Sequence, residues 1–226
     1  MKTDTKLLAW HGWGFDRTCW EPWRDLVSDQ YLMEIWDRGY WGNQHAVEAD
    51  ETSEPKVLFA HSFGLHMCPD EQLRSADLLV IFGGFREFHP AAAQFRRRSK
   101  LILNKMSRTL QEHPEQVLEE FMENAYKPDA PPSINGKECK PQKLLDDLQA
   151  LNRSTLNIEP IKNAQKICIL HGSSDSIVPK AKGRELYDIF QGQASYFEVK
   201  DAGHALPFTH MEQCWAFIKP ELTEIF

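Results

Sequence analysis

The sequence has few residues from which a disulfide framework or a metal centre could be built. It contains five cysteines in 226 residues, an odd number without a CxxC pair, and the nearest two, Cys139 and Cys168, are 29 positions apart. Its nine histidines include no HExxH or comparable metal-binding arrangement. We therefore expect reduced thiols packed as small apolar groups, and neither a metal ion nor a cofactor.

Long apolar runs and an excess of positive charge are also absent. No run of about 18 apolar residues occurs, and residues 1–10 lack the basic and apolar regions of a secretory leader. The formal net charge of −7 argues against general binding to nucleic acid or to an anionic membrane. We therefore expect a cytoplasmic protein that binds neither. Its length and its 42% of hydrophobic residues fit one globular domain.

Short apolar runs rich in β-forming residues recur along the chain and predict strands. Several are apolar at consecutive positions, which is typical of parallel strands covered by helices on both faces. The pattern predicts an α/β fold with a doubly wound, mostly parallel sheet flanked by helices. The six predicted strands are Lys6–Trp10, Tyr31–Ile35, Val57–His61, Leu78–Gly83, Ile167–Gly172 and Ser195–Val199.

Between residues 86 and 159 the apolar spacing changes to the three- and four-residue steps of amphipathic helices. We predict three helices, around Ile102–Leu110, Val117–Met122 and Leu144–Leu151. A proline-rich joint over Lys127–Pro141 separates the second helix from the third. We therefore divide the chain into a core of residues 1–85 and 160–226 and a helical insertion of residues 86–159, which we call the lid.

Ser62 lies at the centre of the segment Ala60–His61–Ser62–Phe63–Gly64, directly after a predicted strand. A nucleophilic serine on a sharp turn between a strand and a helix needs small residues two positions before and after it, because the turn brings those backbones together. Ala60 and Gly64 meet this requirement. An ordinary turn would accept the same pentad, so its meaning depends on what accompanies it.

Two further candidate catalytic residues follow in the chain order nucleophile, acid, histidine. Asp175 comes after the predicted strand that ends at Gly172, and His204 comes after the one that ends at Val199. Because the carboxyl ends of parallel strands meet at one edge of a sheet, we predict that Ser62, Asp175 and His204 converge there as a catalytic triad. Taken singly, each has a structural interpretation: a turn serine, a helix-capping aspartate and a surface histidine.

The loop His11–Gly12–Trp13–Gly14 follows the first predicted strand. A tetrahedral oxyanion needs preorganised N–H donors, and a glycine-flanked loop at this edge can direct a backbone N–H toward it. We predict that the backbone amides of Trp13 and Phe63 form this oxyanion hole, while His11 organises the loop. A tight turn that leads into a helix near Cys19–Val27 is compatible with the same residues.

The sequence resembles the α/β-hydrolase superfamily in five segments that together span nearly the whole chain: LLAWHGWGFDRTCWEPW, IWDRGYWGN, AHSFGL, HGSSDSIVP and AGHALPFTH. The resemblance implies a serine hydrolase with an α/β-hydrolase fold and a helical lid between strands. It places Ser62, Asp175 and His204 on the triad, and it places Trp13 and Phe63 on the oxyanion positions.

Within that superfamily, the chain resembles the pimeloyl-ACP methyl ester esterases of biotin synthesis. The similarity lies in HGWG, in SFG and in the set His204, Pro207, Phe208 and His210. It implies a cytoplasmic serine carboxylesterase that hydrolyses the methyl ester of an acyl chain tethered to acyl carrier protein. Acyl carrier protein is therefore the expected partner.

Three features depart from the pattern of the superfamily. Ala60 stands where the first glycine of the serine turn is usual. Pro69 lies seven residues after Ser62, so the helix that follows the serine must end or kink early. The chain also begins at what resembles the third strand of the standard fold. The expected protein is therefore a compact relative with a reduced sheet.

The lid carries aromatic residues that we predict to contact substrate. Phe88 and Phe121, together with Trp13 of the core, are candidates for the lining of an acyl channel. Residues of this kind also serve as ordinary core. The sequence alone leaves both interpretations open.

A basic cluster is the local exception to the acidic total. Residues 86–108 contain seven basic side chains and one acidic side chain. Arg96, Arg97 and Arg98 form its centre, and an acidic carrier protein or a phosphopantetheine phosphate would complement their charge. The alternative is a solvated helix face balanced by five glutamates between residues 112 and 123. The resemblance favours carrier binding.

Three functions remain compatible with the sequence. The first is a carrier-protein methyl esterase, and the second is a generic small-ester or thioester hydrolase of the same fold. The third is a non-catalytic relative used for binding, against which an intact triad argues. The resemblance favours the first.

Overall fold

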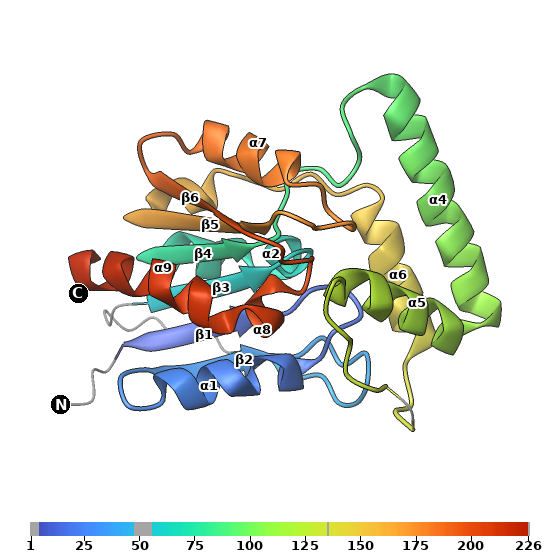
Figure 1. Cartoon of the computed structure of the whole chain (residues 1–226), viewed down its shortest axis with the longest axis horizontal. Coiled ribbons are helices and arrows are strands. Elements are labelled where there is room, and N and C mark those ends of the chain that lie inside the picture. The colour runs from blue at the N-terminus through green and yellow to red at the C-terminus, as the bar shows by residue number, and fades with distance from the viewer. Residues whose placement is uncertain (1–4, 48–55, 135, 226) are drawn as a thin grey trace.

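The computed structural model describes residues 5–47, 56–134 and 136–225. Its parallel strands form one sheet in the order β2-β1-β3-β4-β5-β6 (Figure 1), which confirms the predicted doubly wound sheet. The bounds of each strand differ from the predicted ones by no more than one residue. The strands are β1 (Lys6–Trp10), β2 (Leu32–Trp36), β3 (Lys56–His61), β4 (Leu78–Phe82), β5 (Lys166–Gly172) and β6 (Ala194–Val199).

Helices cover both faces of the sheet because alternate strand residues point to opposite sides. They are α1 (Glu21–Val27), α2 (Gly64–Met67), α3 (Asp70–Ser75), α7 (Ala181–Ile189), α8 (Leu206–Thr209) and α9 (Met211–Ile225), with 3-10 turns at Arg17–Trp20 and Pro160–Asn163. On one face, Phe59 of β3 packs in a cluster with Trp23 of α1 and Ile218 of α9. On the other, Leu58 packs with α2, α3 and α7. The core is therefore two apolar layers with the sheet between them.

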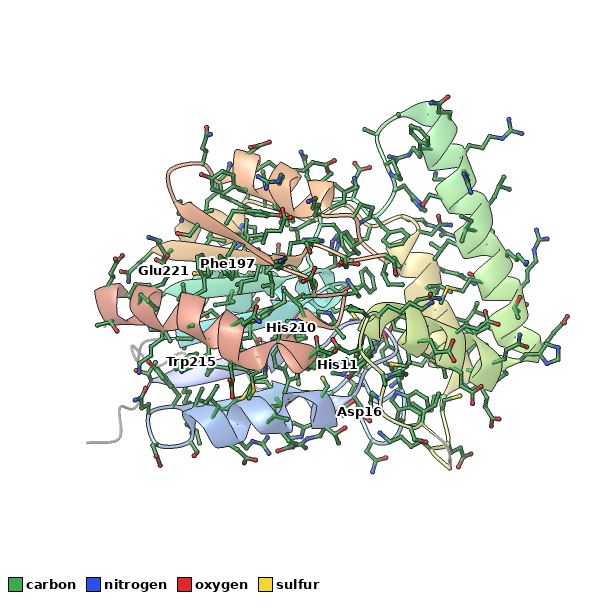
Figure 2. All side chains as sticks on the ribbon, viewed as in Figure 1. His11, Asp16, Phe197, His210, Trp215 and Glu221 are labelled. Carbon is green, nitrogen blue, oxygen red and sulfur yellow. The ribbon has the colours of Figure 1, made fainter. Side chains whose placement is uncertain are left out.

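Helix α9 connects the two edges of its face of the sheet (Figure 2). Trp215 of α9 lies 6.2 Å from Trp23 of α1, measured between ring centroids. Glu221, farther along α9, accepts a hydrogen bond from Ser195 Oγ of β6 and pairs with Lys166 of β5, each at 2.8 Å. Helix α9 thus joins α1 to β5 and β6, the strands that precede Asp175 and His204.

The lid consists of α4 (Ala93–Glu112), α5 (Pro114–Tyr126) and α6 (Pro141–Leu151), which lie between β4 and β5 in the chain, as the three predicted helices do. These helices stand at the end of the sheet where the strands finish (Figure 1). Pro114 and Pro141 begin α5 and α6, where the missing N–H of proline leaves no hydrogen bond unmade. Within the described ranges, no helix is long and apolar enough to cross a membrane.

An ion pair joins the lid to the core. Arg38, in the loop after β2, donates from Nε and Nη2 to the two carboxylate oxygens of Asp147 on α6, at 2.6 and 2.8 Å. The hydroxyl of the fully buried Tyr40 donates to the same carboxylate at 2.8 Å. Burial and the negative charge of Asp147 raise the pKa of Tyr40 well above its ordinary value, so the phenol stays a donor. The loop after β2 therefore fixes the position of α6.

Helix α2 is short, as Pro69 predicts. It ends at Met67, and Cys68 takes the extended conformation that a residue before proline prefers. The chain resumes as α3 at Asp70. The helix after the candidate nucleophile is therefore a single turn followed by a new helix.

Candidate active site

Ser62 occupies the sharp turn that joins β3 to α2. Its φ is +54°, in the left-handed region that non-glycine residues rarely adopt. Its backbone N–H donates to Phe82 O at 2.9 Å, which holds the turn against the end of β4. Gly64 has no room for a side chain, because an added Cβ would lie 2.5 Å from the carbonyl oxygen of His11. The serine turn is therefore strained and touches the loop after β1.

The side chains of Ser62, His204 and Asp175 form one hydrogen-bonded series. Ser62 Oγ donates to His204 Nε2 at 2.8 Å, and His204 Nδ1 donates to Asp175 Oδ2 at 2.7 Å. This arrangement leaves Nε2 as the nitrogen that can accept the serine proton. Asp201, a nearby alternative acid, is exposed and lies 4.0 Å from the ammonium of Lys200. The structure thus brings the three predicted residues together.

The carboxylate of Asp175 is buried and ionised. Its Oδ1 accepts the backbone N–H groups of Ile177 and Val178 at 2.9 and 2.8 Å. Burial raises the pKa of Asp175, but the charge of His204 and hydrogen bonds from His171 and His204 outweigh burial and hold that pKa well below its usual range. The group is therefore negative at neutral pH and is placed to stabilise a protonated His204.

A second buried imidazole, His61, lies behind His204. Its Nε2 donates to the backbone carbonyl of His204 at 3.0 Å, and the two ring centroids are 4.9 Å apart. Burial lowers the pKa of His61 well below its ordinary value, and the neighbouring His204 lowers it further. His61 is therefore neutral, and it fixes the backbone of the loop that carries His204.

A cavity of about 330 Å³ opens beside Ser62, between the core and the lid. Its wall includes Trp13 and Phe63, the residues predicted for the oxyanion hole. Trp13 Nε1 donates to Leu144 O of α6 at 2.8 Å, so the loop after β1 is attached to the lid at this point. The wall is almost wholly apolar. The described residues contain no group of three or more His, Cys, Asp or Glu that could hold a metal ion.

The structure brings some of the predicted lid residues to this cavity. Phe88 and Phe121 line it, and Arg98 is the one charged residue in its described wall. Arg96 instead pairs with Glu87 at 2.9 Å. Arg97 is exposed and lies outside the wall. The three arginines therefore have three different surroundings, as the 100° step between consecutive helical residues requires.

Two parts of the site have no counterpart among the sequence predictions. Phe95, Ile102 and Met106 of α4 line the cavity, and the first two are 55% and 60% exposed. The helical period of α4 was visible in the sequence, but apolar residues on several of its sides conceal which side faces the site. His171 was also missed, although its place at the end of a predicted strand, four residues before Asp175, was the available signal.

No protein-family model matches the sequence, and no curated protein matches it. Solved structures do resemble the fold of this chain. An esterase from Exiguobacterium antarcticum is 14% identical, with a TM-score of 0.80 over 99% of this chain and 93% of that chain. A thermophilic esterase from Thermogutta terrifontis is 16% identical, with a TM-score of 0.74 over 100% and 92%. MenH from S. aureus is 13% identical, with a TM-score of 0.76 over 99% and 95%. At these identities the likeness shows the fold alone, which is the α/β-hydrolase fold.

Proposed function

We propose that this chain is a serine carboxylesterase that hydrolyses the methyl ester of an acyl chain carried by acyl carrier protein, a pimeloyl-ACP methyl ester of biotin synthesis. The observation that carries the proposal is the series Ser62, His204 and Asp175 beside an apolar cavity. The fold, shared with solved esterases, supports the reaction class. The sequence resemblance to pimeloyl-ACP methyl ester esterases supports the substrate.

The reaction proceeds through an acyl-serine. Ser62 Oγ attacks the ester carbonyl carbon while its proton passes to His204 Nε2. The bond from the carbonyl carbon to the methoxy oxygen then breaks, and methanol leaves with that proton. Water repeats the cycle: His204 takes a proton from it, the resulting attack releases the carboxylic acid, and Ser62 recovers its proton. Asp175 keeps the imidazole oriented and stabilises its charged form.

The developing oxyanion is bound by backbone N–H groups. The candidates are the amides of Trp13 and Phe63, whose residues stand in the cavity wall with Ser62. Contacts hold both residues in place: the Trp13 indole donates to Leu144 O of α6, and Phe63 immediately precedes α2. Such donors need little reorganisation during the reaction, which is what makes them effective.

In this proposal the cavity binds the acyl chain, and the exposed arginines of α4 bind the carrier protein. Phe88 and Phe121 offer apolar contacts in the wall, and Arg98 is an exposed positive charge in the same wall. Arg97 adds an exposed positive charge on the same helix. An acidic carrier protein or its phosphopantetheine phosphate would meet these charges. A generic small-ester or thioester hydrolase would need the cavity but no basic surface.

The deciding experiment compares two substrates on the same purified protein. One is a methyl ester of a dicarboxylic acyl chain attached to acyl carrier protein, and the other is a short p-nitrophenyl ester. We expect both to be cleaved by the native protein and neither by Ser62→Ala, with a much higher kcat/KM for the carrier-bound ester. Complementation of a biotin-requiring strain that lacks its methyl esterase extends the test to cells.

Each alternative has its own outcome. Cleavage of the small ester with no cleavage of the carrier-bound ester would indicate the generic hydrolase. Absence of cleavage for both, with no reaction of Ser62 toward phosphonates, would indicate the non-catalytic relative. The two substrates therefore separate the three functions.

A further inference from the structure

Besides His204, a second side chain lies next to the carboxylate of Asp175. It belongs to His171 of strand β5. His171, the penultimate residue of β5, is fully buried. Its Nε2 lies 2.8 Å from the carbonyl oxygen of Val178 and 3.3 Å from Asp175 Oδ2. Both neighbours are acceptors, so Nε2 carries the hydrogen; it donates to Val178 O and stands beside Asp175 Oδ2. Oδ2, the oxygen that accepts from His204, thus has a second N–H group next to it.

The other nitrogen of the His171 ring has no such role. Nδ1 has no hydrogen-bond partner in the part of the chain that the structure describes. It lies against α7 at Gly183, where an added Cβ would stand 2.5 Å away. A buried nitrogen without a partner is unfavourable, and a residue without a side chain is needed to admit the ring. The unpartnered Nδ1 and the glycine at position 183 are both consequences of a ring orientation in which Nε2 faces Val178 and Asp175.

We propose that His171 is a positioning residue for Asp175, and that Gly183 makes the space for it. The proposal rests on the proposed function, because it assigns His171 a role only if Ser62, His204 and Asp175 act together. Backbone N–H groups fix Oδ1 of the carboxylate, while the N–H of His171 lies 3.3 Å from Oδ2. With two N–H groups bonded to Oδ1 and with His204 and His171 beside Oδ2, the carboxylate stays ionised and keeps one orientation toward His204.

The donor also sets how strongly Asp175 attracts the proton of His204. The N–H of His171, 3.3 Å from Oδ2, stabilises the negative charge on that oxygen. Without it, Oδ2 becomes a stronger acceptor, which favours the protonated form of His204. Neutral His204 is the form that accepts the serine proton. As the pH is lowered, activity is therefore lost at a higher pH than in the native protein. Among the described residues, the ring of His61 also faces His204, and its lowered pKa keeps it neutral.

The test compares His171→Leu, which has no donor, with His171→Gln, whose amide nitrogen takes the place of Nε2. For His171→Leu we expect kcat on a short p-nitrophenyl ester to fall about tenfold, as for one lost hydrogen bond to a charged group, with KM little changed. The acidic limb of its pH profile should move to higher pH. His171→Gln should restore both toward the values of the native protein.

His66→Leu is the matched control. His66 is a half-buried imidazole whose Nε2 also donates to a backbone carbonyl, that of Phe85 at 2.9 Å, but it has no hydrogen bond or ion pair with Asp175. Its loss should lower thermal stability without moving the acidic limb. If His171→Leu does not fold, Gly183→Ala displaces the ring from the side of α7 while keeping the donor, and it should move the limb in the same direction.

The outcomes separate this inference from the proposed function. If the native protein cleaves the ester and His171→Leu shows the same kcat and the same acidic limb, the positioning role is wrong and the esterase proposal stands. If His66→Leu moves the limb as far as His171→Leu does, the effect is general loosening and the inference also fails. If the native protein neither cleaves esters nor reacts with phosphonates at Ser62, the proposed function fails first.

Discussion

The backbone of Ser62 has a positive φ, which lowers the stability of the fold but directs the Ser62 side chain toward His204. A non-glycine residue at positive φ costs of the order of 1–3 kcal/mol and persists only where the surroundings impose it. Two contacts hold Ser62 in this conformation: the hydrogen bond from its N–H to Phe82 O and the close approach of Gly64 to His11. The strain places Oγ at the cavity, within reach of His204.

Replacing Ser62 by glycine should therefore stabilise the fold relative to replacing it by alanine. Both variants lose the hydrogen bond to His204 and all hydrolysis, but only glycine relieves the positive φ. We expect Ser62→Gly to have a free energy of unfolding about 1 kcal/mol above that of Ser62→Ala. Urea denaturation of the two variants measures the difference. Equal stabilities would show that the turn is not strained.

Buried neutral histidines make stability depend on pH. Burial lowers the pKa of His66 to about 4 and lowers the pKa of His61 well below its ordinary value. The unfolded chain protonates both near pH 6.5, so below that pH the unfolded state binds more protons than the folded one. The free energy of unfolding must then fall as the pH falls, by at most about 1.4 kcal/mol per pH unit for each histidine.

Denaturant unfolding at several pH values between about 7.5 and 4.5 tests this dependence. For His66 the loss begins near pH 6.5 and ends near its folded pKa of about 4. His66→Gln cannot take up the proton in either state, so its stability should change less steeply over this range than that of the native protein. Parallel curves for the two proteins would contradict the assignment of a neutral His66.

At the scale of elements, the position of the lid depends on α6. Asp147 of α6 accepts hydrogen bonds from Arg38 and Tyr40, and the carbonyl of Leu144, one turn earlier, accepts from Trp13. The side chain of Asp147 is 9% exposed and that of Arg38 is 28% exposed, so the pair is only partly screened by water. Removing the carboxylate leaves a guanidinium and a phenol without their acceptor.

We expect Asp147→Leu to lower the free energy of unfolding by about 2 kcal/mol, a value between those for exposed and for fully buried pairs, because Arg38 is partly exposed. Exchanging both partners, as in Arg38→Met with Asp147→Leu, should recover part of that loss. Glu159→Gln is the control, because its pair with Lys162 is exposed and contributes little. A loss for Asp147→Leu no larger than that of the control would show that the pair does not hold the lid.

The elements themselves could be predicted because each is encoded locally. Apolar runs mark the strands to within one residue, and Pro69 marks the end of α2. The carboxyl ends of parallel strands share an edge, which brings Ser62, Asp175 and His204 together without further information. The contacts of Asp147 could not be predicted in this way. They join residues 107 and 109 positions apart, and no local pattern specifies which loop a given helix face meets.

At the scale of the whole molecule, charge is unevenly distributed. The chain carries a net charge of −7, yet α4 presents positive charge beside the cavity. Of its three consecutive arginines, Arg96 is paired with Glu87, whose pKa falls below its ordinary value because of the hydrogen bond from Arg96. Arg97 and Arg98 are exposed. An acidic partner would therefore meet mainly the last two.

Replacing Arg96, Arg97 and Arg98 by glutamine should raise KM for the carrier-bound ester more than KM for a short neutral ester, and it should weaken the salt dependence of the former. Among single variants, Arg96→Gln should have the smallest effect, because Glu87 already compensates its charge. Steady-state kinetics at low and high salt measure both quantities. Equal losses for the two substrates would mean that the arginines support the packing of the lid, and no change would mean that they form a solvated face.

In the proposed function, Ser62 is a nucleophile activated by His204 and Asp175. The most direct test of this role is the rate of covalent labelling by a fluorophosphonate, followed by intact mass and by mapping of the modified peptide. We predict one adduct, on Ser62, with none on Ser62→Ala. Labelling should be about 10³-fold slower or more in His204→Ala, and it should also be strongly slowed in Asp175→Asn. Labelling of Ser62→Ala at the native rate, or an unchanged rate in both other variants, would contradict the role of Ser62 as an activated nucleophile.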